Sequence, residues 1–364
     1  MSRQFRSDDT DKWKYGFGDG HDAATYSVPA NAGIATVSAG GFAITLDSAS
    51  SFANGDLVLI HQTRGTGAGN WELNKIASGG GTTSITLKHA LMNSYTDSGA
   101  SQAQIIELKE YNGLTVSTTI NAPVWDGNKG GIIAFLDKAT CTISGTLSAT
   151  GKGFRGGPAV NYNTQRGEGT GGDRGGTTQS ANGSGGGGGG GGAGAGGSGG
   201  HANAGNVGGG NTGAEGGLAV GNSSLTSINF GGAGASSSSS NSSQNGGEGG
   251  GIIIIFAKNI VNSSLIDASG ITKPQNNECS GPSGAGGSIL LKCVTATLGS
   301  STITSTSPTP PATNWDGGRG SIGSVGRIHL DYSGSYTGTT SPAIDVRQDL
   351  TIKPVVGLRP VMIF

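Results

Sequence analysis

Six aspartates stand in or beside apolar β-type segments of this 364-residue chain, where carboxylates could act on a substrate. Most glycosidases cleave the glycosidic bond with two carboxylates that face each other across a groove. These aspartates are therefore candidates for polysaccharide hydrolysis. Asp267 opens the segment Asp-Ala-Ser-Gly, where a strand turns, and a structural cap explains it equally well. The six are Asp126, Asp137, Asp267, Asp316, Asp331 and Asp345.

Other catalytic, cofactor and metal motifs are missing from the sequence. The glycine-rich segment from Arg64 to Gly69 lacks the spacing of a dinucleotide fingerprint, and no helical pattern follows it, so we expect a turn. There is no phosphate-binding loop, and no serine stands in the strand-turn-helix context of a nucleophile elbow. The histidines are scattered without metal-ligand spacing. We therefore expect a non-enzymatic protein with no catalytic, cofactor or metal residue; the histidines are His21, His61, His89, His201 and His329.

The composition favours a thin, layered interior over one large core. Glycine supplies 73 of the 364 residues, hydrophobic residues 33% and charged residues 12%. The net charge is −1 and no basic cluster stands out, which argues against nucleic-acid binding and against a polybasic membrane contact. The longest apolar run, residues 252–257, is too short to cross a bilayer, so we expect no membrane insertion.

Three cysteines, Cys141, Cys279 and Cys293, are widely spaced and form no CxxC pair. An odd, scattered set predicts neither a disulfide framework nor a zinc site, and we expect buried thiols. The polar N-terminus, residues 1–9, has no apolar segment of the secretory type. For a surface-type composition this indicates release by another route, for example assembly into a virion.

The first third of the chain predicts an arm followed by a β domain. Residues 1–28 carry Trp13, Tyr15, Phe17 and Tyr26 among polar residues, which is typical of an attachment segment whose aromatics need a partner surface. Residues 29–122 alternate short β-type runs with turn signals, for example at 41–46, 57–60, 84–87 and 105–108. Helical periodicity is nearly absent, so we expect an all-β protein with an N-terminal β domain.

A unit of two β-type segments recurs further along the chain. Glycine-led apolar runs at 130–136, 250–256, 286–291 and 326–330 are followed by second segments at 142–151, 264–270, 301–305 and 343–346. Starts at 251, 287 and 326 are 36 and 39 residues apart, a period typical of stacked coils. We therefore expect a β-solenoid over residues 123–150 and 250–346, followed by a C-terminal tail at 347–364.

A Trp-Asp-Gly element occurs twice, at Trp125-Asp126 and at Trp315-Asp316, each time before an apolar strand of the repeat. One interpretation is an exposed aromatic platform. The favoured one is structural: the aspartate caps backbone N–H groups in a turn, and the tryptophan covers the core.

Residues 151–249 form a glycine-rich insertion, and 40 of the 73 glycines lie between Gly151 and Gly251. It is either a flexible linker or a bundle of polyproline-II-like glycine helices that pair laterally through their backbones. Order is favoured because two copies of one β unit flank it and turn-length polar stretches divide it. Those stretches would then be binding loops. The candidate receptor contacts are Tyr162, Asn163, Arg166, His201, Asn203, Asn222 and Phe230.

These residues resemble a known group of proteins. Segments 69–72, 125–127, 130–135 and 151–157, together with the polyglycine tract, resemble glycine-rich β-helical proteins of phage tails and bacterial surfaces. The tract with spaced loops is similar to the polyglycine-II domains of phage tail-fibre adhesins. The resemblance covers roughly residues 50–330. It implies attachment to a host or surface through loops that emerge from a glycine core, and it supplies no catalytic residue.

Three functions follow as alternatives. The first is a virion or surface adhesion protein, such as a tail fibre or tail tip, that binds a host protein or glycan. The second is a self-assembling extracellular filament or surface-layer protein, and the third is a phage polysaccharide depolymerase. We expect a homo-oligomer, either a trimer or a polymer, joined to other structural proteins through residues 1–28.

Overall fold

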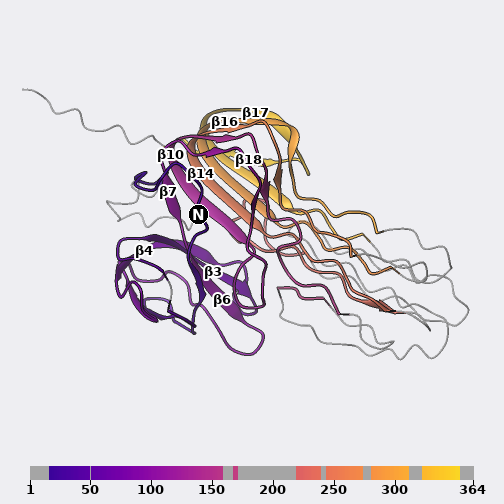
Figure 1. The fold of residues 1–364 in the computed structure, drawn as a ribbon, viewed down its shortest axis with the longest axis horizontal. Helices are drawn as coiled ribbons and strands as arrows, with labels where there is room; N and C mark the ends of the chain where they lie inside the picture. Colours follow the sequence, from indigo (N-terminus) through magenta and orange to yellow (C-terminus); the bar gives the residue numbers. More distant parts are fainter. Residues whose placement is uncertain are drawn as a thin grey trace, which may run out of the picture.

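The computed structural model describes residues 16–49, 51–158, 167–170, 219–238, 243–273, 280–310 and 322–352. Every regular element in these ranges is a β-strand, so the prediction of an all-β protein is confirmed for this part of the chain. Within the same ranges, no helix has the length and apolar character that a membrane crossing requires. The strands form two large curled sheets, one antiparallel and one parallel, and a small two-stranded ribbon (Figure 1).

The N-terminal sheet is antiparallel, and two of its longer strands are buried along nearly their whole length. An isolated bridge between Ile34 and Leu46 joins its two ends, so the sheet curls around its own core. Ile44, Ile60 and Ile105 belong to that core. In order across the sheet its strands are β1 (Asn31–Gly33), β6 (Gln102–Glu107), β3 (Leu57–Arg64), β4 (Trp71–Ser78), β5 (Ser84–Leu87) and β2 (Ala43–Thr45).

The second sheet is built from parallel strands that lie side by side (Figure 1). Its main row is β7 (Lys109–Tyr111), β10 (Ile132–Ile143), β14 (Ile252–Asn262), β16 (Ser288–Thr304), β17 (Arg327–Ser341) and β18 (Asp345–Gln348). Short strands continue the coils: β8 (Thr115–Val116), β9 (Ile120–Asn121), β11 (Leu147–Ser148) and β15 (Ile266–Asp267). This arrangement is compatible with a β-solenoid-like fold. The ribbon consists of β12 (Ser237–Ser238) and β13 (Ser243–Gln244).

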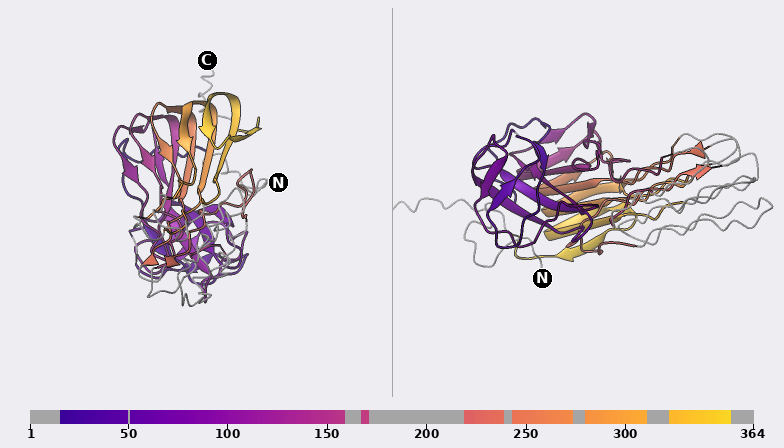
Figure 2. Two further views of the ribbon diagram at one scale, coloured as in Figure 1. Left: turned by 90° about the vertical axis from the view of Figure 1, so that its right-hand side faces the viewer. Right: turned by 90° about the horizontal axis from the view of Figure 1, so that it is seen from below.

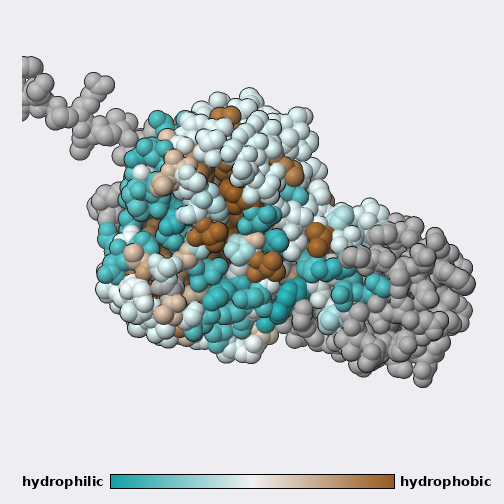
Figure 3. Space-filling view, viewed as in Figure 1, coloured by the Kyte–Doolittle hydropathy of each residue, from teal (hydrophilic) through white to brown (hydrophobic). Residues whose placement is uncertain are grey.

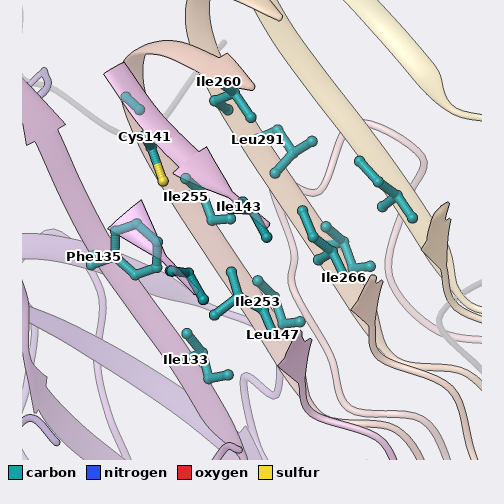
Figure 4. Close-up of a cluster of buried hydrophobic side chains, with 14 of the residues drawn as sticks. Ile133, Phe135, Cys141, Ile143, Leu147, Ile253, Ile255, Ile260, Ile266 and Leu291 are labelled. Carbon is teal, nitrogen blue, oxygen red and sulfur yellow. The ribbon is translucent and has the colours of Figure 1, made fainter. Parts of the chain in front are cut away.

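Apolar residues of one type stack along the parallel sheet. Ile133 aligns with Ile253, Ile253 with Ile289, and Ile289 with Ile328. Their side chains point into a common core with those of the shorter strands, including Leu147 and Ile266 (Figure 4). Burying one such side chain contributes roughly 1.5–3 kcal/mol, and each coil needs its neighbours to complete this burial.

The opposite face of the parallel sheet packs against the N-terminal sheet. Ile132, Ile254 and Phe256 form one cluster with Leu59 and Trp71 of the antiparallel sheet. Strands of both sheets are therefore buried on two sides, which accounts for the continuous apolar runs in the sequence. On the outer surface, Figure 3 shows patches of apolar side chains near the middle of the visible side of the molecule.

Several predicted boundaries differ from the structure. Residues 109–121 were expected in the N-terminal domain, but β7, β8 and β9 pair with the parallel sheet. The segment 343–346 was expected to be a second strand of the fourth repeat. Instead, β18 pairs with the first part of β17, with Asp345 opposite His329, and begins a further coil. Part of the expected tail therefore belongs to the sheet.

The described part of the predicted arm packs on this same chain. Phe17 is buried with the residues between the two sheets, and Tyr26 stacks against Tyr111 and Phe135. Residues 16–28 therefore cover the first coil of the parallel sheet. Trp13 and Tyr15 lie outside the described residues.

Candidate functional site

Extended glycine-rich segments run out side by side from one end of the parallel sheet (Figure 2). We call segments 153–157, 231–234, 246–251, 268–271 and 282–287 the glycine platform. The amides of Gly231 and Gly234 donate to the carbonyl oxygens of Gly250 and Gly247, both at 2.9 Å. Donors and acceptors are each three residues apart and run in opposite directions, so these two segments pair antiparallel.

Segments of the glycine platform have hydrogen-bonded neighbours on more than one side. Gly247 and Gly250 donate to the carbonyl oxygens of Pro282 and Ala285, both at 2.8 Å. Gly249, between them, donates to the carbonyl oxygen of Phe154 at 2.9 Å. The amide of Ile271 donates to the carbonyl oxygen of Glu248 at 2.9 Å. Segment 246–251 therefore bonds to four neighbours, whereas a strand in a flat sheet bonds to two.

Close approach explains why these positions are glycine. A Cβ on Gly249 would collide with the backbone of Gly231, and one on Gly284 would collide with the backbone at Glu248. Neither glycine has its φ in the left-handed region. Space between neighbouring backbones, and not a turn conformation, therefore requires glycine at both sites.

An aromatic cluster forms the root of the glycine platform. Trp125, Phe154 and Phe230 meet edge to face, with ring centroids 5.3 to 6.3 Å apart, and all three are fully buried. Such pairs add about 0.5–1.5 kcal/mol beyond the burial of their area. Trp125 therefore lies in the core at the base of the platform. Phe230, expected to contact a receptor, is a core residue instead.

A buried carboxylate completes this root. Oε1 of Glu168 accepts hydrogen bonds from Nη1 of Arg64 at 3.1 Å and from Nε of Arg155 at 3.0 Å. Oε2 accepts from the indole Nε1 of Trp125 at 3.1 Å and from the amide of Arg155 at 3.0 Å. The side chain has no exposure, so these contacts satisfy a charge that would otherwise be costly to bury.

The N-terminal sheet also holds the segment that enters the platform. Nε2 of His61 lies 2.9 Å from the carbonyl oxygen of Ile228, and Nδ1 lies 2.9 Å from Oγ1 of Thr63. A carbonyl only accepts, so Nε2 carries the proton and donates it. Burial lowers the pKa of His61 to about 4, which keeps the imidazole neutral. The Nε1 of Trp71 donates to the carbonyl oxygen of Leu225 at 3.3 Å.

The remaining predicted binding residues are only partly placed. Asn222 is exposed, but its Oδ1 accepts from the amide of Thr226 at 3.0 Å and its Nδ2 donates to Oγ1 of Thr226 at 2.7 Å. It therefore shapes a turn at the surface. The other five candidates, like Trp315 and Asp316, lie outside the described residues: Tyr162, Asn163, Arg166, His201 and Asn203.

Three of the six candidate carboxylates have structural partners. Asp126 caps a turn by accepting from the amides of Asn128 and Lys129 at 2.8 and 2.9 Å. Asp137 is buried and accepts from three backbone amides. Asp267 accepts from Oγ1 of Thr150 and of Thr304, both at 2.7 Å, and so links three successive coils.

The structure brings two of the six together around a buried histidine. Nδ1 of His329 lies 2.8 Å from Asp345, and Nε2 lies 3.3 Å from Asp331. Nε of Arg347 donates to Asp331 at 2.7 Å. Burial alone would raise the pKa of Asp331, but the hydrogen bonds from His329 and Arg347 outweigh it and hold that pKa below its ordinary value. Asp331 is therefore suited to remain ionised and poorly suited to donate a proton.

Comparison with known proteins gives no family. No family model matches this chain, and no curated protein does. Among solved structures, the chain is similar to the tailspike protein gp49 from Pseudomonas phage LKA1, with 10% sequence identity, a TM-score of 0.23 and 85% of this chain covered. The aligned region spans 38% of the length of that tailspike.

Proposed function

We propose that this chain is a non-enzymatic adhesion or structural protein of a virion tail or a cell surface. A β-solenoid base would carry a polyglycine-II-type bundle, and the loops at the far end of the bundle would bind a host-surface protein or glycan. The observation that supports this proposal is the backbone hydrogen bonding of the glycine platform in several directions.

The spacing of those hydrogen bonds supports the bundle. A polyproline-II helix repeats every three residues and forms no internal hydrogen bonds, so all of its amides need outside partners. Gly231 and Gly234, and likewise Gly247 and Gly250, donate at this interval. Segment 231–234 pairs with 247–250, segment 247–250 pairs with 282–285, and Ala285 donates back to Gly232 at 2.9 Å. Three segments that bond in a closed triangle fit a bundle and not a sheet.

Anchoring of the bundle supports a binding role for its loops. The base of the platform is attached to β3 of the antiparallel sheet, where Arg64 bonds to Glu168 and His61 contacts the carbonyl oxygen of Ile228. Loops on a rigid base lose less conformational entropy on binding than free chains do. The predicted contacts Tyr162, Asn163, Arg166, His201 and Asn203 fall in sequence between segments of this platform.

The depolymerase alternative has weaker support. The side chain of Asp345 is 44% exposed, but Asp331 and His329 are 3% and 1% exposed, so the second carboxylate presents little surface to a polysaccharide. A glycosidase also needs one carboxyl group that stays protonated near neutral pH, whereas Asp331 has a lowered pKa. We propose that this cluster holds β18 on the sheet. The filament alternative instead predicts that copies of this chain assemble into open-ended polymers.

Binding to whole cells tests the proposal. Fluorescently labelled full chain would be added to a panel of bacterial isolates, and bound fluorescence would be compared with that of two loop variants. One variant combines Tyr162→Ala, Asn163→Ala and Arg166→Ala; the other combines His201→Ala and Asn203→Ala. The matched control is Phe42→Ala, which removes an exposed aromatic from the N-terminal sheet region.

We expect one or both loop variants to lose binding to a responsive isolate while the control retains it. Equal binding by all variants would place the contact elsewhere and reject the loops as the site. Concentration-dependent polymers in electron micrographs, without cell binding, would favour the filament alternative. Release of reducing ends from capsule or lipopolysaccharide would favour the depolymerase.

A further inference from the structure

A compact group of metal-ligand side chains joins the N-terminal segment to the first parallel strand. Asp19 and His21 come from the loop before β1, and Glu110 comes from β7. One ligand atom from each of the three lies within 4.8 Å of the other two. Nδ1 of His21 is 2.5 Å from Oδ1 of Asp19 and 3.8 Å from Oε2 of Glu110.

The buried carboxylate of Glu110 is only half satisfied. Its side chain is 1% exposed, and Oε1 accepts a hydrogen bond from the amide of Asp19 at 3.0 Å. Oε2 is buried without a hydrogen-bond partner and faces His21 at a distance too long for a hydrogen bond. A buried carboxylate oxygen left without a partner is costly, so a ligand that fills this position would relieve the cost.

The loop that carries Asp19 and His21 is held in place around Glu110. Gly18 and Gly20 on either side of Asp19 have φ values of +80° and +72°, a conformation that favours glycine. The amide of Glu110 donates to Oδ2 of Asp22 at 2.7 Å, and the amide of Asp22 donates to the carbonyl oxygen of Glu110 at 3.1 Å. The ligand atoms therefore converge because the backbone places them.

Three lysines surround this group, and the charge of one of them, Lys75, acts on both Asp19 and Glu110. Nζ of Lys138 donates to the carbonyl oxygen of Asp19 at 2.7 Å. Nζ of Lys109 pairs with Glu107 at 2.5 Å and lies 3.5 Å from Asp22. Two carboxylates and one imidazole thus form an acidic group that a divalent ion would neutralise.

We propose that Asp19, His21 and Glu110 bind a divalent transition-metal ion of the zinc class. An imidazole nitrogen with two carboxylate oxygens suits zinc, manganese or cobalt better than calcium or magnesium, which prefer oxygen ligands alone. Metal–ligand bonds of about 2.0–2.2 Å separate neighbouring ligand atoms by roughly 3–3.5 Å. Asp19 and His21 would need to move slightly apart, which their exposed side chains permit. Open coordination positions would face solvent, and the ion would fasten residues 16–22 to β7.

Zinc titration of the full chain tests this site. After treatment with EDTA, the protein would be titrated with ZnCl2 by calorimetry, with His21→Ala, Asp19→Asn and Glu110→Gln as site variants. Asp47→Asn is the matched control, because it removes a carboxylate that pairs with Lys129 away from this cluster. Co²⁺ loading supplies a second readout, since its visible absorption reports the ligand geometry.

We expect one zinc ion per chain, with affinity at least about tenfold weaker in each site variant and unchanged in the control. Calcium and magnesium at about 1 mM should not displace the zinc. Should Glu110→Gln fail to fold, His21→Ala and Asp19→Asn decide the question, because their side chains are half exposed. Zinc binding that all site variants retain, or no binding at about 100 µM zinc, would overturn the proposal.

Discussion

Arg64 and Glu168 form an ion pair with a distance of 3.1 Å between Nη1 and Oε1, although 104 positions separate them in the chain. Arg64 ends β3 of the antiparallel sheet, and Glu168 lies in the glycine-rich insertion. The pair therefore links the base of the molecule to the segments that project from it. Because the carboxylate is fully buried, its removal would leave Arg64 and Arg155 without their shared acceptor.

Replacing this carboxylate by its amide tests the linkage. Glu168→Gln should lower the free energy of unfolding by about 3 kcal/mol, because breaking a buried ion pair leaves the partner charge buried and uncompensated. Urea unfolding at pH 7 measures the effect. The control is Asp47→Asn, which breaks the partly exposed pair with Lys129 and should cost less than about 1 kcal/mol. Equal losses in the two variants would mean that Glu168 is not an anchor.

Steric demand within the glycine platform gives a second prediction. Gly249→Ala should destabilise the protein by about 1–3 kcal/mol, because its Cβ would meet the backbone of Gly231. Gly169→Ala is the matched control in the same insertion: nothing lies within 4 Å of its Cβ position and its φ is outside the left-handed region. Its effect should stay within about 1 kcal/mol and could be stabilising.

Urea unfolding measures the stability of the two variants, and limited proteolysis measures how readily their glycine-rich insertion is cleaved. Peptide mapping should show faster cleavage between residues 151 and 251 for Gly249→Ala than for Gly169→Ala. Rapid cleavage of the unmodified protein throughout this range, with the flanking strands intact, would indicate a flexible insert. The proposed bundle would then be rejected.

Parts of this fold could be predicted from the sequence because the relevant forces are local or periodic. The apolar runs at 132–136, 252–256 and 288–291 repeat, and the structure aligns them as parallel neighbours. The burial of Trp125 fits an aromatic residue placed shortly before such a strand, where it can cover the core. Segment 109–121 was misassigned because a strand's partners are set by the fold and not by its own residues.

The candidate sites depended on contacts between distant residues. Asp19 and Glu110 are 91 positions apart, and nothing in the spacing of the histidines indicated that His21 would join them. Nothing in the sequence around Glu168 indicated that it would pair with Arg64, 104 positions away. Phe230 carried a misleading signal, because an aromatic within a polar stretch can equally be a core residue that enters from a loop.

The buried imidazole of His61 predicts a loss of stability in acid. Its pKa is about 4 in the folded protein, lowered by burial, against about 6.5 in the unfolded chain. Above pH 6.5 both states are neutral at this position. As the pH falls from 6.5 towards 4, the unfolded state takes up a proton that the folded state does not, and the free energy of unfolding declines by about 3 kcal/mol.

A variant that cannot titrate isolates this contribution. Between pH 7.5 and 4.5, His61→Gln should lose about 2–3 kcal/mol less than the unmodified protein, and its amide can still donate to the carbonyl oxygen of Ile228. Urea unfolding at the two pH values measures the difference. His21→Ala serves as the control: Asp19 raises the pKa of His21, so its contribution has the opposite sign and declines as the pH rises. An unchanged acid loss in His61→Gln would show that His61 is not its source.

The accessibility of two buried thiols shows whether the core of the parallel sheet opens in the native protein. Cys141 and Cys293 are free and fully buried in the cluster inside the sheet, as expected from the sequence. Burial raises the pKa of both thiols, that of Cys293 to about 12, so neither forms the reactive thiolate near neutral pH.

Reaction with Ellman's reagent tests this burial. In the native chain the reagent should modify at most one thiol, that of Cys279. In guanidinium chloride it should modify all three cysteines. Native Cys279→Ser should not react at all. Rapid reaction of that variant would mean that the coils separate readily, because the reagent can reach these sulfurs only if the core opens.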